Sequence, residues 1–82
     1  MSTICLFGSD YASARELHAA LKALLDLPDY YGMNADALND CLSEYLVCPS
    51  LWIRRGGPDD VQAALDLIAR VFRDNNAEVK EL

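Results

Sequence analysis

The sequence predicts a small α/β domain built on a three-stranded parallel sheet. Three stretches of strand length occur near the start, the middle and the end of the chain, as "STICLF", "SLWIRR" and "AEVKEL". Segments with the apolar spacing of helices separate them, and strands joined by helical crossovers run parallel. With 82 residues there is room for a single domain, 1–82, and one modest core.

The first stretch, "STICLF", is short, apolar and bounded by Gly8. We therefore expect a strand that is covered on both faces. The chain has three cysteines, Cys5, Cys41 and Cys48, an odd number without metal-binding spacing. This pattern favours a reduced cytoplasmic protein over a disulfide-bonded secreted one, with apolar packing as the expected role of Cys5 and Cys41.

A helix is predicted in "SARELHAALKALLDL". Ser13 and Glu16 have the spacing of a capping box at its start, and Pro28 is expected to end it. His18 lies at the edge of the apolar stripe, with no nucleophile or metal ligand at a useful spacing, so we expect a structural role for it. The residues expected to form the buried stripe are Leu17, Leu21 and Leu24.

A second helix is predicted to begin after Asn34, which is a favourable N-cap residue. Pro49 marks the limit of this helix. Four apolar residues recur with a period near 3.6 and are expected to form its inner face. They are Leu38, Cys41, Leu42 and Tyr45.

The stretch "SLWIRR" is predicted to form the second strand and to end at Gly56 and Gly57. A third helix is then expected, with Pro58 in its first turn and Asp59 and Asp60 at the positive end of its dipole. Its expected buried residues are Val61, Leu65, Ile68 and Phe72.

The third helix is expected to end near Asn75 and Asn76. The tail "AEVKEL" alternates weakly, which favours a short third strand. The alternative is that the helix continues through Glu78, so the sequence leaves open whether Glu78 lies on a helix or on a strand.

The charge of the chain argues for a basic partner. Its formal net charge is −6, from 13 acidic and 7 basic residues, which disfavours direct binding to nucleic acid or to an anionic membrane. No Lys or Arg occurs between Ala23 and Ile53, although several acidic residues do. The start, "MSTICLFGSD", lacks the basic region of a signal peptide and is too short to span a membrane.

The second predicted helix carries acidic residues four positions apart on its outer face: Asp36, Asp40 and Glu44. Such like-charge pairs cost a few tenths of a kcal/mol each in an isolated helix, so fold stability alone does not favour them. A simple solvated face is the alternative interpretation.

Two aromatic residues, Tyr30 and Tyr31, precede this helix in a predicted loop, followed by Gly32. Loop tyrosines combine a large contact area with a hydroxyl group, as recognition surfaces often do. We expect Gly32 to adopt a positive φ or to approach a partner closely. Together with the carboxylates, these residues suit a protein surface rich in Arg and Lys.

The stretches "LPDYYGMNADALNDCL", "LHAALKALLDL" and "VFRD" resemble the barstar family, whose best-known member is the intracellular inhibitor of the secreted ribonuclease barnase. The similarity covers nearly the whole chain. It implies a barstar-like two-layer fold, in which about three to four helices pack against the three-stranded sheet.

The resemblance also implies how a partner is bound. In the family, the loop and the second helix plug the active site of a microbial ribonuclease, and carboxylates lie where substrate phosphates would bind. Asp40 matches the central anion, which meets the catalytic arginines and histidine of the enzyme, and Asp36 supports it. The implied partner-binding residues are Tyr30, Tyr31, Gly32, Asn34, Ala35, Asp36, Asn39, Asp40, Ser43, Tyr45, Asp74 and Glu78.

Some of these positions depart from the family pattern. Ala35 and Asn39 stand where the best-known member has a larger apolar residue and an aromatic one, which removes contact area and points to a different nuclease. Tyr45 is assigned to the core by helical periodicity but to the interface by the resemblance. The chain after the second strand is also shorter, which bears on Asp74 and Glu78.

The function expected from the sequence is inhibition of a small basic ribonuclease, as an immunity protein. The protein is expected to bind one-to-one, to be a monomer when free, to act in the cytoplasm and to use no cofactor, metal or catalytic residue. The alternative is a barstar-like module that neutralises a different basic toxin or nucleic-acid-binding protein. A third possibility is an enzyme that uses Asp36, Asp40 and Glu44. The sequence disfavours it, because no convergent His, Lys or glycine-rich phosphate loop accompanies these residues.

Overall fold

The computed structural model describes residues 3–29, 31–44 and 48–82. Within these ranges the chain forms three strands, three α-helices and one short 3₁₀ helix. In chain order they are β1 (Thr3–Phe7), η1 (Gly8–Asp10), α1 (Ala14–Leu25), α2 (Ala35–Leu42), β2 (Ser50–Arg54), α3 (Asp59–Asp74) and β3 (Val79–Glu81).

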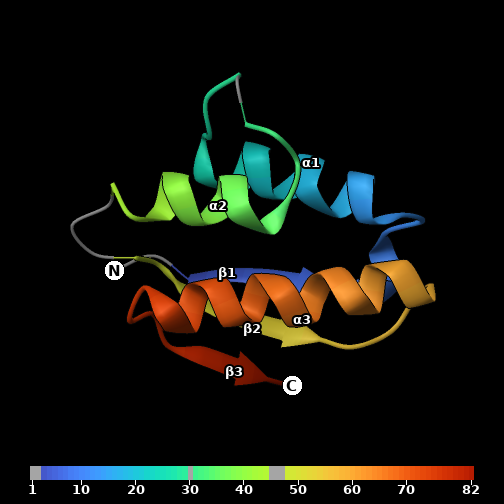
Figure 1. Cartoon of the computed structure of the whole chain (residues 1–82). Coiled ribbons are helices and arrows are strands. Elements are labelled where there is room, and N and C mark those ends of the chain that lie inside the picture. Colours follow the sequence, from blue (N-terminus) through green and yellow to red (C-terminus); the bar gives the residue numbers. More distant parts are fainter. Residues whose placement is uncertain (1–2, 30, 45–47) are drawn as a thin grey trace.

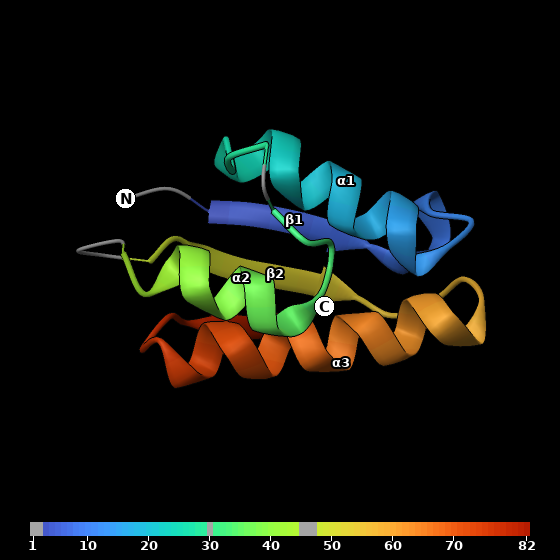
Figure 2. The same ribbon diagram turned by 45° about the horizontal axis from the view of Figure 1, so that its top comes forward.

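The strands form one parallel sheet in the order β1-β2-β3. Ile4 pairs with Leu51, and Ile53 pairs with Glu81. Both crossovers lead to the next strand on the same side, and crossovers of one hand then place their helices on one face of the sheet. Figures 1 and 2 show α1, α2 and α3 on that face. The predicted two-layer α/β fold with a three-stranded parallel sheet is confirmed.

Among the described residues, no helix covers the other face of the sheet, and this corrects one prediction. Ile4 and Leu6 of β1 are buried, whereas Cys5 and Phe7 between and beyond them are exposed. The expectations that β1 is covered on both faces and that Cys5 is buried are therefore wrong. On the same open face the Lys80 ammonium lies 5.1 Å from the centre of the Trp52 ring, a cation–π contact.

The core lies between the sheet and the three helices. Its fully buried side chains come from every layer: Leu6, Leu17, Leu21, Leu38, Leu42, Leu51, Ile53, Val61, Leu65, Ile68 and Phe72. Leu24 was expected among them but is 52% exposed. The buried face of α1 is centred between Leu21 and His18, and at 100° per residue Leu24 falls at its edge.

The helix ends follow local rules. The Ser13 hydroxyl accepts a hydrogen bond from the Glu16 backbone N–H at 3.3 Å, and the Glu16 carboxylate accepts one from the Ala12 N–H at 3.1 Å. The predicted capping box is confirmed, with its return bond one residue early. Helix α1 ends before Pro28, because Asp26 adopts φ 52° and closes a Schellman motif, with the Leu27 N–H bonded to the Lys22 carbonyl at 2.9 Å.

The remaining elements agree with the predictions. The tail forms β3, and Glu78 precedes it, with the Glu78 carbonyl accepting a bond from the Leu51 N–H at 2.8 Å. The alternative in which α3 continues through Glu78 is wrong. Gly57, at φ 79°, passes so close to the Gly8 backbone that a side chain there would collide with its carbonyl oxygen.

Candidate functional site

Helix α2 begins at a well-formed cap. The side-chain oxygen of Asn34 accepts a hydrogen bond from the Ala37 N–H at 2.8 Å, and its amide nitrogen donates one to the Gly32 carbonyl at 3.1 Å. The predicted N-cap is therefore confirmed. Because both ends of the Asn34 amide are used internally, this residue fixes the loop to the first turn of α2.

The inner face of α2 consists of Leu38, Cys41 and Leu42, all buried, as predicted. Burial raises the pKa of the Cys41 thiol, and the nearby Glu44 and Asp40 carboxylates add to this shift. The helix ends at Leu42, with Ser43 as its C-cap, and the Ser43 hydroxyl donates to the Asp40 carbonyl at 2.8 Å. Ser43 thus closes the helix on its exposed side.

The outer side of this segment carries three exposed carboxylates, Asp36, Asp40 and Glu44, which we call the acidic face. Glu44 lies in the turn just after α2. The ion pairs found among the described residues involve Lys22 and Arg55, and none includes a member of the acidic face. The acidic face is thus free of internal salt bridges within that part of the chain.

Tyr31 lies in the loop, as expected, but its side chain is only 5% exposed. Its hydroxyl is 2.6 Å from Nδ1 of His18, which is itself 6% exposed. Burial raises the pKa of Tyr31 to about 12, with Cys41 adding to the shift, and burial lowers the pKa of His18. His18 thus takes the structural role predicted for it, tying α1 to the loop.

Tyr31 also borders the acidic face. With Asp40, Cys41 and Glu44 it lines a hollow of about 120 Å³. A partner side chain that enters this hollow would meet Tyr31 and the carboxylates of Asp40 and Glu44. The contribution of Tyr31 as a partner contact stays a prediction, and the structure adds a supporting role beneath Asp40.

The loop has its positive φ at Met33, at 57°. Gly32 was expected to adopt a positive φ or to approach a partner closely; the first alternative is wrong, and the second stays a prediction. Gly32 is instead confined by packing, because a Cβ there would lie 3.3 Å from the Asn34 amide nitrogen and 3.4 Å from the Ala37 Cβ. The glycine permits the close approach of the loop to the capped end of α2.

A second hollow, of about 280 Å³, lies between α2 and α3. Asn39, on the α2 side, accepts a hydrogen bond through its side-chain oxygen from the Asn75 amide nitrogen at 2.9 Å. Asp36 and Asp74 both line this hollow, and their roles as partner contacts stay predictions. The lining residues of this interhelical hollow are Ala35, Asp36, Asn39, Leu67, Arg70, Val71 and Asp74.

Sequence analysis missed Arg70, which places a cation in the interhelical hollow beside Asp36 and Asp74. The absence of bases between Ala23 and Ile53 is a fact of the sequence, but α3 supplies one from a distant part of the chain. A signal was present, because Arg70 precedes Asp74 by four residues and so shares its face of α3.

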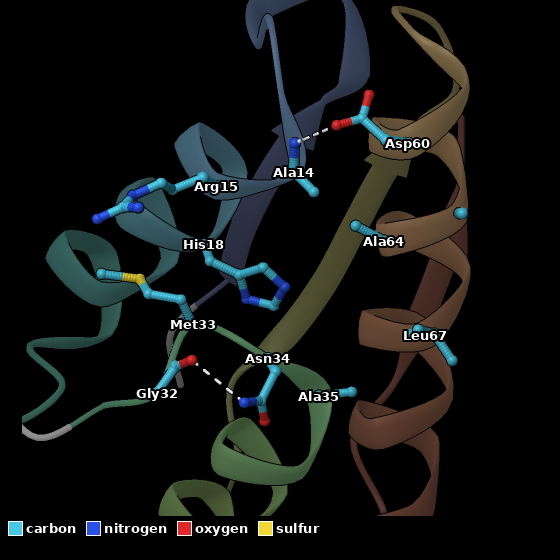
Figure 3. Close-up of a pocket in the computed structure, with 11 residues that line it drawn as sticks. Ala14, Arg15, His18, Gly32, Met33, Asn34, Ala35, Asp60, Ala64 and Leu67 are labelled. Carbon is cyan, nitrogen blue, oxygen red and sulfur yellow. Dashed lines mark hydrogen bonds between the residues drawn. The ribbon is translucent and has the colours of Figure 1, made fainter.

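A third and larger hollow, of about 630 Å³, adjoins the interhelical hollow and shares Ala35 and Leu67 with it. Figure 3 shows it between α1, the loop and α3, with the His18 ring pointing into it from α1. The Asp60 carboxylate, at its other side, accepts a hydrogen bond from the Ala14 N–H at 2.8 Å. Four alanines are among the residues that line it: Ala14, Ala35, Ala63 and Ala64.

The other predicted contacts are not gathered at these hollows. Glu78 is exposed but lines none of the three. Tyr30 and Tyr45 lie outside the described residues, so the two assignments weighed for Tyr45 stay predictions. Among residues 3–29, 31–44 and 48–82, no cluster of His, Cys, Asp or Glu is placed to hold a metal ion.

The helices of the described segments are all too short or too polar to cross a bilayer. Comparison with known proteins gives a more specific result. A curated protein of Bacillus subtilis (strain 168), named "Putative ribonuclease inhibitor YrdF", is 47% identical over 49 residues, which make up 60% of this chain. The aligned stretch spans about half of that relative, 54% of its length.

The family comparison covers almost the whole chain. The family model described as "Barstar (barnase inhibitor)" matches residues 1–81. The match includes every element from β1 to β3, together with the capped loop and the acidic face. On this basis the chain belongs to the barstar family.

Proposed function

We propose that this protein inhibits a small basic ribonuclease by placing α2 and the preceding loop in the nuclease active site. The observation that carries the proposal is the acidic face, whose three exposed carboxylates form none of the ion pairs among the described residues. The family description, barnase inhibitor, and the name of the Bacillus relative support the same function.

The chemistry of such inhibition follows from electrostatics. A ribonuclease active site holds cationic groups that bind the phosphates of RNA, and carboxylates can occupy those places. Asp40 would be the central anion, with Asp36 one turn earlier as its support. The negative potential of the acidic face would speed the encounter, and charge-assisted hydrogen bonds in the buried contact would then slow release. Such a protein occupies the site and carries out no reaction.

The biological setting belongs to the same proposal. An immunity protein protects the cell that makes a toxic nuclease, so it would act in the cytoplasm before the nuclease is secreted. We expect a one-to-one complex, because one acidic face is present per chain, and a monomer in the absence of the nuclease. A barnase-like enzyme is the expected target class.

A stoichiometric titration tests the proposal. A panel of small basic bacterial ribonucleases, with barnase as the first, is assayed at increasing inhibitor concentration. We expect at least one to lose activity near a one-to-one ratio, without turnover of the inhibitor. If the whole panel keeps its activity, the alternative of a barstar-like module for another basic protein is favoured.

Two aspartates provide a matched comparison within that assay. Asp40→Ala is expected to weaken inhibition by a hundredfold or more, on the order of the cost of removing one partner of a buried ion pair. Asp59→Ala removes an exposed carboxylate from the start of α3, outside the acidic face, and is expected to change inhibition little. Equal effects of the two substitutions, with both variants folded, would contradict the assignment of the acidic face.

A further inference from the structure

Asn75 connects the end of α3 to α2 in one defined orientation. Its side-chain nitrogen lies 2.8 Å from the Val71 carbonyl oxygen and 2.9 Å from the side-chain oxygen of Asn39. A backbone carbonyl only accepts hydrogen bonds, so the Asn75 atom at this place has to be the nitrogen, which carries two hydrogens. The atom of Asn39 that faces it must then be the accepting oxygen.

This arrangement determines what Asn39 offers to a partner. Its oxygen is engaged by Asn75, while its amide nitrogen has no hydrogen bond among those found in the described residues. Asn39 is exposed on α2 and lines the interhelical hollow. A protein that covers the hollow therefore meets two N–H donors from Asn39, beside the acceptor carboxylates of Asp36 and Asp74.

Arg70 adds further donors to the same hollow. It is exposed, and the ion pairs of the described residues do not include it, although Asp36 and Asp74 line the hollow too. A partner surface that was cationic throughout would enclose Arg70 among like charges, which costs binding energy. A carboxylate placed there would satisfy both Asn39 and Arg70, provided that nuclease bases beside it pair with Asp36 and Asp74, which line the same hollow.

The walls of the hollow fit a side chain of this kind. Ala35 and Val71 are partly or fully buried small apolar residues, and Leu67 is 52% exposed. They offer contact to the methylene groups of a Glu or Asp side chain, while the donors lie nearby. The volume of about 280 Å³ accommodates such a group.

We propose that the interhelical hollow binds a carboxylate side chain of the partner nuclease, held by the Asn39 amide and the Arg70 guanidinium. The inference rests on the proposed function and names the feature that selects the partner. Nuclease bases would meet Asp36, Asp40 and Asp74, and one nuclease acid would meet Arg70. A nuclease with a base at that place would be rejected.

Two substitutions probe the donors with little change of shape. Asn39→Asp keeps an oxygen to accept the bond from Asn75 and replaces the donating NH₂ with a second oxygen. Arg70→Gln removes the guanidinium. Arg73→Gln is the matched control, since Arg73 is exposed on the same helix but does not line the hollow. Urea denaturation verifies that each variant is folded.

The test measures binding to the panel ribonuclease that is inhibited most tightly. We expect Asn39→Asp and Arg70→Gln each to raise the Kd by about tenfold or more, the usual effect of losing a hydrogen bond to a charged group, and Arg73→Gln to leave it within about twofold. Each Asp and Glu of the nuclease is then changed to Ala. One of these changes should be strongly non-additive with Arg70→Gln.

The outcomes separate this inference from the proposed function. If Asp40→Ala weakens binding while Asn39→Asp and Arg70→Gln do not, the carboxylate pocket is wrong and the inhibitor function stands. If the two donor variants weaken binding but no nuclease carboxylate couples to Arg70, the pocket binds another group and the inference is overturned. If no nuclease of the panel is inhibited, both proposals fall together.

Discussion

Two groups of exposed carboxylates in this molecule are treated differently. At the sheet end, Arg55 pairs with Asp66 of α3 and with Glu81 of β3, whose carboxylate lies 2.8 Å from the guanidinium. The hydrogen bond to Asp66 is the main cause that raises the pKa of Arg55. The acidic face takes part in none of the ion pairs of the described residues.

One group of carboxylates thus contributes to the folded structure, whereas the other remains free to bind a partner. Arg55, Asp66 and Glu81, which we call the Arg55 cluster, join the end of β2 to α3 and β3. The charges of this cluster are therefore paired within the molecule. The acidic face places Asp36 and Asp40 one turn apart on α2, which opposes helix stability slightly, with Glu44 in the turn that follows. These charges are left available to a partner. The following predictions test this contrast, beginning with the largest expected effect.

A base introduced beside the acidic face should pair with its carboxylates and so weaken binding of the nuclease. Ser43→Lys places an ammonium three residues after Asp40, within reach of its carboxylate. We expect the Kd for the inhibited ribonuclease to rise by about tenfold to a hundredfold, because the new cation both neutralises Asp40 and repels the basic partner. Ala19→Lys, which adds the same charge at an exposed position of α1, should have a much smaller effect.

Salt should separate the two groups through the rate of association. Raising the ionic strength from about 0.01 to 0.15 M shortens the Debye length from about 30 to 8 Å. We therefore expect the association rate constant to fall by about tenfold, with a smaller change in the dissociation rate. An Asp66→Asn variant should show the same salt dependence as the unchanged protein. Stopped-flow mixing measures both, and a salt-independent association rate would contradict electrostatic steering by the acidic face.

The loop next to the acidic face should be stabilised by the buried contact between Tyr31 and His18. Tyr31→Phe removes the hydroxyl bonded to His18 and should lower the free energy of unfolding by about 1 kcal/mol. Urea denaturation followed by the fluorescence of Trp52, the chain's single tryptophan, measures the change. An unchanged midpoint would mean that the hydroxyl–imidazole bond contributes nothing to stability.

The same contact predicts how stability depends on pH. Burial lowers the pKa of His18 from its ordinary value of 6.5, so the folded state favours the neutral imidazole. As the pH falls through the pKa that His18 has in the unfolded chain, the unfolded chain binds the proton first and the protein becomes less stable. This decline ends once the pH is below the lower pKa that His18 has in the folded protein. His18 is the only histidine. His18→Gln should therefore flatten the dependence between about pH 7 and 5.5, above the range in which ordinary carboxyl groups titrate.

The smallest effect is expected where charges are already paired. Asp66→Asn weakens one of the ion pairs of Arg55 on an exposed surface, and such pairs contribute about 0 to 1 kcal/mol. We expect a loss of stability within that range and no change in the Kd for the ribonuclease. A clear loss of affinity would show that the Arg55 cluster also faces the partner.

The parts of the fold that were predictable are those set by local sequence. The cap at Asn34 and the capping box at Ser13 each act within a few residues, and they correctly marked where α2 and α1 begin. The exposure of Cys5 and Leu24 was mispredicted, because a side chain's burial depends on which face the helices cover and how each helix is rotated.

The candidate site was predictable to the same extent. The acidic face follows from four-residue spacing along one helix, so its exposure could be anticipated. The bond from Asn75 to Asn39 joins residues 36 positions apart, and the approach of Arg70 to Asp36 likewise crosses from one helix to another. The apolar pattern of a single helix does not predict contacts between two helices. The proposed carboxylate pocket depends on these contacts.

Helix α2 has a consequence for how this molecule can diversify. Its buried residues are Leu38, Cys41 and Leu42, and Ala35 and Ala37 pack against the core while partly buried. Asp36, Asn39 and Asp40 are exposed. A library that randomises only the exposed positions would leave the buried side chains and the cap at Asn34 intact. Variants of these exposed positions could therefore be selected for binding to new partners without a change in the core of the protein.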